Sequence, residues 1–448
     1  MKRFIYRALR ITSALDHWLR ERLTPAGWLV LGAAGAAAAA GLDTNQTVTY
    51  RAFTFLAALL ALSYVASLFF HARLDASRDL PRYATAGEPC VYRVVVANRG
   101  ARALTGATVL ERFRDPRPGF EEWRRTREPG EERRNWWDRT IGYFRWRWQI
   151  ERRLPRDVEP GEMAALGPGE RQELRLAFTP RRRGRIELAG LTVGRTDALG
   201  LVRGIARVPL AARLIALPRR YRLPEIALPG KRKFQPGGVS LAASVGDSEE
   251  FLALRDYRPG DPLQRVHWKS YARTGRPVVK EYQDEFFERH ALVLDTGTRR
   301  GEDAAFEDAV ALAASFVYTI DTHECLLDLL FVGAGAAQPG VRAYTAGRGQ
   351  MQSGHMLEVL AAAAPSEPAA FAELARAVLA RRESVSSVIL ILLAWDEERR
   401  ALVSALRAAG AEVRALLVSL ERDAPRKLPP GILLLIPGKI ELGLSALR

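Results

Sequence analysis

The sequence predicts three parts in order: two membrane-spanning helices, a β-sandwich domain, and an α/β domain with a parallel sheet. Three observations predict this fold class. Two uncharged apolar segments lie near the N-terminus, and short apolar runs separated by Gly, Pro and Asn follow them. Apolar strands alternating with helices fill the C-terminal part. The 448 residues are enough for several domains with full cores.

The two apolar segments, residues 26–42 and 52–70, predict a transmembrane hairpin over residues 25–71. Gly32 and Gly35 are expected to let the second helix approach the first closely. Basic residues crowd residues 1–24 and follow the second span, whereas the short loop between the spans carries one. By the positive-inside rule both termini lie in the cytoplasm, so we expect a two-span protein of the bacterial inner membrane.

The composition agrees with this location. The chain has 67 Lys and Arg against 51 Asp and Glu, a formal net charge of +16. Such an excess favours anionic partners, and it also fits a membrane protein that keeps its positive charge on the cytoplasmic side. Cys90 and Cys325 are far apart and form no metal-ligand spacing, which is typical of a reducing compartment.

Residues 80–217 predict the β-sandwich domain, with strand-like runs at 90–98, 107–113, 173–178, 185–193 and 212–218. An insert rich in Arg and Trp occupies residues 112–155. Its interleaved Arg and Trp side chains suit a single-stranded nucleic-acid groove, but its many acidic residues count against that interpretation, and the alternation over 143–151 predicts a strand. A position at the lipid headgroups is a third interpretation.

Residues 286–448 predict the α/β domain, and Asp295 and Asp396 follow two of its apolar strands. In parallel sheets, ligands bind at the carboxyl ends of the strands. This part resembles a von Willebrand factor type A domain, which holds a divalent metal through a DxSxS motif and later Thr and Asp residues. Here the motif is Asp295-Thr-Gly-Thr-Arg299, and Thr345 is the candidate for the later threonine. The resemblance implies a degenerate Mg²⁺ site at Asp295 and Asp396; otherwise Asp295 makes a strand-end hydrogen bond or an ion pair.

Residues 218–285 contain the most specific pattern, EFLALRDYRPGDPLQRVHWKSYARTGRPVVKEY. It resembles the signature of the domain of unknown function 58 family through a set of matching positions: Glu250, Phe251, Arg255, Tyr257, Gly260, Asp261, Arg265, Trp268, Ala272 and Arg273. The order of parts along the chain also matches that family. The resemblance implies partners, namely MoxR-type AAA+ ATPases, transglutaminase-like proteins and other type A-domain membrane proteins, besides membrane lipids. It also implies a role in complex assembly or envelope stress.

The chemistry of this signature predicts a turn at Gly260 followed by a helix that Asp261 caps and Gly275 ends. Arg265, Lys269 and Arg273 are four residues apart, so they would share one helix face as a basic stripe. Trp268 is expected to pack between domains. We therefore predict a partner-binding surface formed by six residues: Arg255, Asp261, Arg265, Trp268, Lys269 and Arg273.

Motifs for catalysis do not occur in the sequence. It contains no phosphate-binding loop, nucleophile elbow, zinc-protease helix or paired CxxC. We therefore expect no enzyme activity and no cofactor other than the degenerate Mg²⁺ site. The function that follows is a membrane-anchored adaptor or scaffold; the alternative is a divalent-metal-dependent or nucleic-acid-binding membrane protein.

Overall fold

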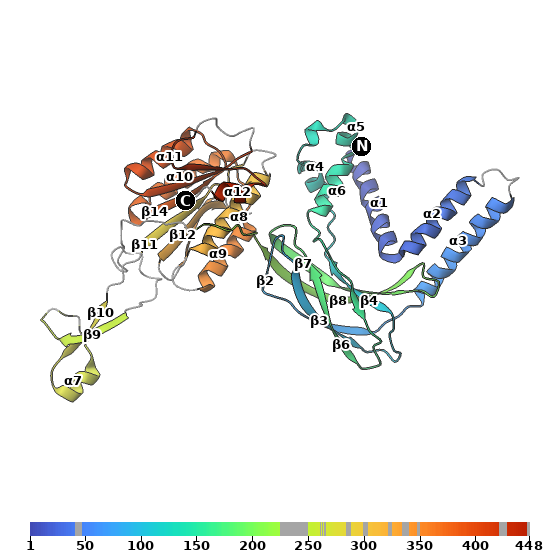
Figure 1. The fold of residues 1–448 in the computed structure, drawn as a ribbon, viewed down its shortest axis with the longest axis horizontal. Helices are drawn as coiled ribbons and strands as arrows, with labels where there is room; N and C mark the ends of the chain where they lie inside the picture. Colours follow the sequence, from blue (N-terminus) through green and yellow to red (C-terminus); the bar gives the residue numbers. More distant parts are fainter. Residues whose placement is uncertain are drawn as a thin grey trace. The chain divides into compact units, whose positions relative to one another are not determined.

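The structure is a computed structural model, and it divides into two compact units, Met1–Arg219 and Arg220–Arg448 (Figure 1). It describes residues 1–40, 47–224, 250–259, 261, 263, 266–283, 288–298, 303–320, 325–333, 340–346, 350–420 and 428–445. The predicted turn residue Gly260 and the stripe residue Arg265 lie outside these ranges.

Three helices open the first unit: α1 (Lys2–Arg22), α2 (Pro25–Ala40) and α3 (Thr47–Leu68). Within α3, Val48–Leu68 is long and apolar enough to cross a membrane, with a mean hydropathy of 1.6. The apolar helix α2 is shorter, at 16 residues. The helices α2 and α3 lie side by side (Figure 1). The described part of the chain therefore has one helix that meets the length of a span and a shorter companion.

The contact between α2 and α3 does not use the glycines that the sequence suggests. A Cβ atom added at Gly32 or Gly35 would meet nothing within 4 Å among the described residues. Ala34, in contrast, is 5% exposed. The prediction that Gly32 and Gly35 admit the second helix is wrong, because both glycines point away from it.

The β domain follows as two facing sheets. The first contains β1 (Leu74–Asp79), β3 (Cys90–Asn98) and β6 (Arg171–Phe178) in the order β1-β3-β6. The second has the order β2-β8-β7-β4-β5, formed by β2 (Tyr83–Thr85), β8 (Arg203–Leu217), β7 (Gly184–Thr196), β4 (Ala107–Phe113) and β5 (Gly161–Met163). Four of the five predicted strand-like runs lie within these strands, and the fifth, 212–218, extends one residue beyond β8. Alternate side chains such as Val94, Val109 and Phe178 are fully buried and form the shared core.

A buried charge network lies at the edge of this core. Arg78 and Glu111 form an ion pair at 2.6 Å, and both side chains are 2% exposed. The Tyr92 hydroxyl donates to the other carboxylate oxygen of Glu111 at 2.7 Å. Burial raises the pKa of Glu111 to about 7, although Tyr92 and Arg78 act to lower it.

The Arg/Trp-rich insert is helical, which corrects the strand expected over 143–151. It contains α4 (Phe120–Arg125), a 3₁₀ turn at Glu131–Arg133, α5 (Trp136–Ile141) and α6 (Tyr143–Glu151). Trp146 and Ile150 are four residues apart, so they share a face in a helix as well as in a strand. The buried partners decide between the two: Trp146 packs on Trp123, and on Tyr6 and Leu9 of α1.

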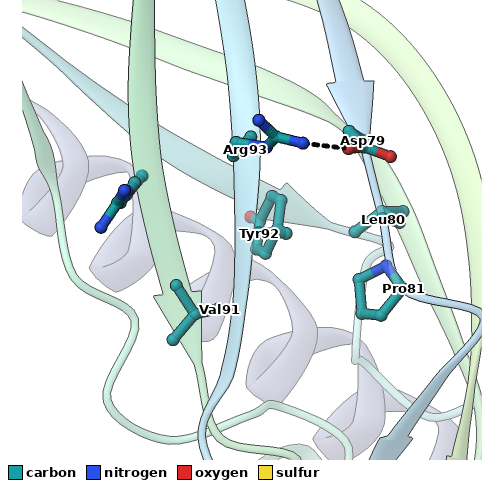
Figure 2. Close-up of a pocket in the computed structure, with 7 residues that line it drawn as sticks. Asp79, Leu80, Pro81, Val91, Tyr92 and Arg93 are labelled. Carbon is teal, nitrogen blue, oxygen red and sulfur yellow. Dashed lines mark hydrogen bonds and ion pairs between the residues drawn. The ribbon is translucent and has the colours of Figure 1, made fainter.

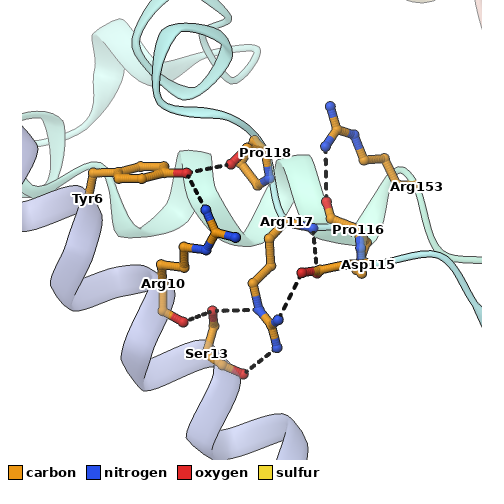
Figure 3. A network of polar contacts seen from close by, with 8 residues as sticks. All are labelled: Tyr6, Arg10, Ser13, Asp115, Pro116, Arg117, Pro118 and Arg153. Atoms are coloured by element: carbon orange, nitrogen blue, oxygen red, sulfur yellow. Dashed lines mark hydrogen bonds and ion pairs between the residues drawn. The ribbon is translucent and has the colours of Figure 1, made fainter.

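Polar contacts join α1 to the same insert (Figure 3). The Tyr6 hydroxyl donates to the carbonyl of Pro118 at 3.1 Å, and Arg10 donates to that hydroxyl. Arg117 donates from Nε to Ser13 Oγ at 3.2 Å and pairs with Asp115. One face of α1 is thus fixed to the insert by aromatic packing and by hydrogen bonds.

The corner between α1 and α2 is attached to the turn between β7 and β8. The Thr24 hydroxyl donates to the carbonyl of Gly200 at 2.6 Å, and the Thr24 amide donates to that of Leu201 at 3.1 Å. Asp197 fixes this turn by accepting from the amides of Leu201 and Val202 at 2.8 and 2.9 Å. Gly27 is required here, since a Cβ would lie 2.2 Å from the Leu201 oxygen. The β domain therefore holds the base of the apolar helices.

The C-terminal domain in the second unit is built on a six-stranded sheet of order β13-β12-β11-β14-β15-β16. The strands are β11 (Glu288–Leu294), β12 (Cys325–Gly333), β13 (Gly340–Ala346), β14 (Ser387–Leu392), β15 (Glu412–Val418) and β16 (Ile432–Leu435). Neighbouring strands are parallel except for β13, which is an antiparallel edge strand. The predicted parallel sheet is confirmed in this mixed form.

Helices cover both faces of this sheet, as the continuous apolar strands require. Helices α10 (Phe371–Leu379) and α11 (Glu397–Ala408) pack on one face through Phe371, Leu374 and Leu402. Helices α8 (Asp303–Thr319) and α9 (Gln350–Ala362) pack together on the other face, and α12 (Ile440–Leu444) contacts β16 (Figure 1). The chain runs outward from β11 in both directions, so the carboxyl ends of β11 and β14 meet at a topological switch point.

Candidate functional site

The signature forms a small hairpin, here called the signature hairpin: β9 (Glu250–Asp256), β10 (Val278–Gln283) and the helix α7 (Trp268–Thr274) between them. The two strands are antiparallel, with Arg255 opposite Val279. Val266 pairs with Val279 and is 6% exposed. Gly275 ends α7 in the left-handed conformation at φ 66°, which a glycine adopts without strain. In its described residues the signature therefore encodes a hairpin that carries the short helix α7.

An ion pair holds the connection between β9 and α7. Nη1 and Nη2 of Arg255 donate to the two carboxylate oxygens of Asp261, each at 2.7 Å, and the Arg258 amide donates to Asp261 at 2.8 Å. Arg255 first, and then the amide, lower the pKa of Asp261 to about 2. Asp261 closes this turn, and the predicted helix does not run unbroken from Asp261 to Gly275, because Val266 pairs with Val279 as an isolated bridge. The helix begins only at Trp268, after His267.

The face of α7 that this turn presents is exposed. The exposed fraction is 60% for Trp268 and 42% for Tyr271, and their rings meet edge to face at 6.1 Å. Among the described residues nothing covers Trp268, and its predicted packing between domains stays a prediction. Lys269 and Arg273 lie one turn apart on the same exposed helix, without an ion pair in the part of the chain that the structure describes. Trp268 and Tyr271 share one side of α7 and Lys269 and Arg273 another; these four exposed side chains together are called the α7 face below.

The two predicted metal ligands lie at the switch point, where the structure places a third side chain between them. Asp295 follows β11 and Asp396 follows β14, and Arg399 of α11 bridges the two carboxylates. Two nitrogens of Arg399 reach Oδ2 of Asp295 at 2.7 Å. The guanidinium also stacks over the ring of Phe371 at 4.1 Å. Arg399 and Asp295 are 2% and 1% exposed, so this ion pair is out of contact with solvent.

Every oxygen of Asp295 has a donor in this arrangement. Its Oδ1 accepts from the Gly297 amide at 2.9 Å, and its Oδ2 also accepts from the Leu393 amide at 3.2 Å. Burial raises the pKa of Asp295, while Arg399 and the two amides oppose this by stabilising the carboxylate. Asp396 caps α11 by accepting from the Arg399 amide at 3.1 Å. These contacts match the expected strand-end ion pair.

The remaining candidate ligands are also engaged or misplaced. The Thr296 hydroxyl lies 3.0 Å from the carbonyl of Val332 and 2.9 Å from Ser366 Oγ. Thr345 lies inside the strand β13, opposite Asp328 near the start of β12, and not in a loop beside Asp295. Among the described residues, no group of three or more His, Cys, Asp and Glu could hold a metal ion. The residues around Asp295 do not fit Mg²⁺, because a guanidinium already supplies the positive charge.

Sequence reasoning missed Arg399 and Ser366. Arg399 follows Asp396 by three residues, a spacing that fits a helix N-cap and a reach back across it, so a signal was present. Ser366 comes from an irregular segment that pairs with Gly297 as an isolated bridge, and no sequence pattern marks it.

The surface of the β domain offers one further hollow, of about 460 Å³, beside β1 and β3 (Figure 2). Its lining includes Asp79, Tyr92, Arg93 and Arg175, and an ion pair at 3.1 Å joins Arg93 to Asp79. Both side chains of this pair are mostly exposed. The hollow therefore has the character of a solvated surface.

The fold and these sites define a protein with an apolar N-terminal helix, a β-rich domain, a signature hairpin and a mixed α/β domain. Residues 253–436 match the family described as "Protein of unknown function DUF58". The chain therefore carries a DUF58 family domain, as the signature predicts.

Comparisons with individual proteins add relatives without an assigned role. The chain is 27% identical over 192 residues to the "Uncharacterized protein YeaD" of Bacillus subtilis (strain 168), covering 42% of this chain and 44% of that protein. The match spans less than half of the relative's length.

Among solved structures, the CARDB domain of the PF1109 protein from Pyrococcus furiosus, in complex with di-metal ions, covers 33% of this chain and 94% of its own. Its identity is 16% and the TM-score 0.18. The ASH/PapD-like domain of human CEP192 covers 32% of this chain and 87% of its own, at 11% identity and a TM-score of 0.16. Scores this low carry no weight for fold or function.

Proposed function

We propose that this protein is a membrane-anchored, non-catalytic adaptor that binds a MoxR-type AAA+ ATPase through the signature hairpin. The observation that carries the proposal is the α7 face: two aromatic and two basic side chains exposed on a helix whose connecting turn is held by the Arg255–Asp261 ion pair. Aromatic residues in a rigid setting are the usual anchors of protein interfaces. Lys269 and Arg273 suit an acidic partner surface.

Anchoring follows from α3 together with α2. A bilayer core of about 30 Å needs about 20 apolar residues, a length that α3 meets. The 16 residues of α2 fall short by a few, a mismatch that local thinning of the bilayer can absorb. As a two-span hairpin these helices leave both termini in the cytoplasm, at the inner membrane of a bacterium.

The α/β domain then serves as a scaffold of the von Willebrand factor type A kind without its metal. Arg399 takes the place of the cation between Asp295 and Asp396. A site saturated by its own arginine has no open position for a divalent ion. Other type A-domain and transglutaminase-like membrane proteins are further partners in this proposal, and complex assembly or envelope stress is the setting.

The nucleic-acid alternative loses support from the insert. Its arginines pair with neighbouring glutamates, among them Arg134 with Glu128, Arg145 with Glu131 and Arg147 with Glu151. Trp123 and Trp146 are 2% exposed, so these two rings have no free face on which a base could stack, whereas Trp136 and Trp137 are 63% and 66% exposed.

The test is an affinity capture from solubilised native membranes with the full chain as bait. A variant with Trp268→Ala, Lys269→Glu and Arg273→Glu is compared with the native chain, and circular dichroism checks that it folds. The matched control reverses two exposed charges elsewhere, Arg381→Glu and Arg382→Glu. We expect the native chain and the control to capture an AAA+ ATPase identified by mass spectrometry, and the α7 variant to lose it.

Two results would contradict the proposal. Equal capture by the α7 variant would remove the docking role of this face. If none of the three chains captures an AAA+ ATPase, the proposal that such an ATPase is the partner is wrong.

A further inference from the structure

The helix α1 has two contrasting faces. Tyr6 and Leu9 pack on the insert and are 9% exposed. A second set of apolar side chains follows intervals of four, three, four and three residues and so shares one face of the helix. This set, called the α1 stripe, consists of Phe4, Ala8, Ile11, Leu15 and Trp18.

The α1 stripe is exposed along its whole length. The exposed fractions are 77% for Phe4, 67% for Ile11, 55% for Leu15 and 38% for Trp18. Large apolar side chains in one continuous row on a helix mark a surface that another apolar phase or partner covers. The insert does not cover it, because the insert packs on the face that carries Tyr6 and Leu9.

The end of the stripe touches the apolar helix α3. The rings of Trp18 and Tyr64 meet at 5.9 Å, and the Arg22 guanidinium stacks over both, at 5.6 and 5.8 Å. Tyr64 lies in the last turns of α3, which ends at Leu68. The Trp18 end of the stripe therefore lies at the level where the candidate span would leave the bilayer. Trp, Tyr and Arg side chains are typical of that level.

The positive charge of α1 indicates what kind of surface covers the stripe. The helix has six basic residues against two acidic ones, Asp16 and Glu21. Both acids are paired, Asp16 with Arg20 and Glu21 with Arg207. Nη1 of Arg22 is buried without a hydrogen-bond partner in the described part of the chain. A basic helix with an apolar aromatic face is the pattern of helices that lie in the headgroup layer of anionic membranes.

We propose that α1 is an interfacial helix whose stripe lies in the headgroup layer of the bilayer that α3 crosses, with anionic lipid headgroups beside its basic residues. The proposal rests on the membrane anchoring in the proposed function. It adds that the membrane holds the insert and the β domain in a fixed orientation, since α1 joins both to the apolar helices.

The test uses the full chain in lipid nanodiscs that contain phosphatidylcholine and phosphatidylglycerol. A polarity-sensitive fluorophore is attached at Ile11→Cys or Leu15→Cys in the stripe, or at His17→Cys, which is exposed on the opposite side of α1. Cys90 is buried, and the unsubstituted chain gives the background labelling of the native cysteines. Lipids with brominated acyl chains quench a probe that enters the bilayer, and iodide quenches a probe in water.

We expect brominated lipid to quench the probes at positions 11 and 15 several-fold more than the probe at position 17, with iodide giving the reverse order. Equal quenching at the three positions would overturn the proposal. Protection of the stripe probes from both quenchers would also overturn it, because a second copy of the chain would then cover the stripe.

A probe at Phe55→Cys separates this inference from the proposed anchoring, because Phe55 is 66% exposed on α3. Lipid quenching at position 55 without quenching at position 11 would remove the interfacial role of α1 alone. Loss of lipid quenching at both positions would remove the anchoring as well.

Discussion

The Asp295–Arg399 pair and the Arg255–Asp261 pair join the same two chemical groups at the same 2.7 Å, yet they differ in what surrounds them. Arg399 and Asp295 are 2% and 1% exposed, and every oxygen of Asp295 has a donor. Arg255 and Asp261 are 34% and 15% exposed, and they support a helix whose aromatic and basic side chains face solvent.

This difference separates a buried ion pair from one that lies beside exposed side chains. A buried pair that is fully hydrogen-bonded has nothing left to offer a ligand. A partly exposed pair contributes little stability by itself but can fix the geometry of the side chains around it. The switch point is the conventional place for a ligand in an α/β sheet; here the Asp295 carboxylate is buried against Arg399, whereas the described side chains of α7 are exposed.

The largest expected effect on stability comes from breaking the buried Asp295–Arg399 ion pair. Arg399→Leu would leave the Asp295 carboxylate buried without its counter-charge and should lower the free energy of unfolding by about 3–5 kcal/mol. Urea unfolding of the full chain in detergent measures it. The control is Arg400→Leu, since Arg400 is 53% exposed in its pair with Glu397 and should contribute less than about 1 kcal/mol. Equal losses in the two variants would show that the switch point is not closed by a buried ion pair.

The second prediction concerns another buried ion pair, Arg78–Glu111 in the β domain. This pair should make the stability of the chain depend on pH. Burial raises the pKa of Glu111 from 4.5 to about 7, so the folded chain holds this proton more tightly than the unfolded chain. The contribution is fully present below pH 4.5 and is lost as the pH rises through about 7. The melting temperature should therefore fall between these pH values by more in the native chain than in Glu111→Gln. Glu173→Gln, at a site 53% exposed, serves as control and should keep the native slope.

The smallest expected effect is that of a divalent cation. A ligand that binds the folded chain raises its stability with concentration. Millimolar Mg²⁺, or its removal with EDTA, should leave the melting temperature of the native chain unchanged, because Arg399 occupies the space between the two carboxylates. A rise with Mg²⁺ that disappears in Asp295→Asn would contradict the closed site and restore the metal-dependent alternative.

The sequence predicts the fold well where hydrophobic periodicity is strong. The strands β3, β4 and β12 coincide with apolar runs, because each buries alternate or continuous side chains in a sheet. It fails for residues 143–151, where Trp146 and Ile150 satisfy both a strand and a helix and only packing on Tyr6 decides.

The sequence predicts where the candidate site residues lie in the fold, but not which side chains surround them. The positions of Asp295 and Asp396 at strand ends follow from the order of elements. The arrival of Arg399 between them depends on how α11 packs on β15, which no local pattern encodes. The exposure of Trp268 likewise depends on what lies around α7, and a tryptophan in a sequence is more often buried.

The most direct measurement is the affinity of the purified full chain for the captured AAA+ ATPase, compared between variants of the α7 face and of the switch point. Trp268→Ala should weaken binding by about 2 kcal/mol, or roughly 30-fold in Kd, as truncation of an interface anchor does. Asp396→Asn, at a carboxylate that is 49% exposed beside the buried Asp295–Arg399 pair, should leave Kd unchanged. The reverse order, with binding lost in Asp396→Asn and kept in Trp268→Ala, would place the function at the switch point and contradict the account.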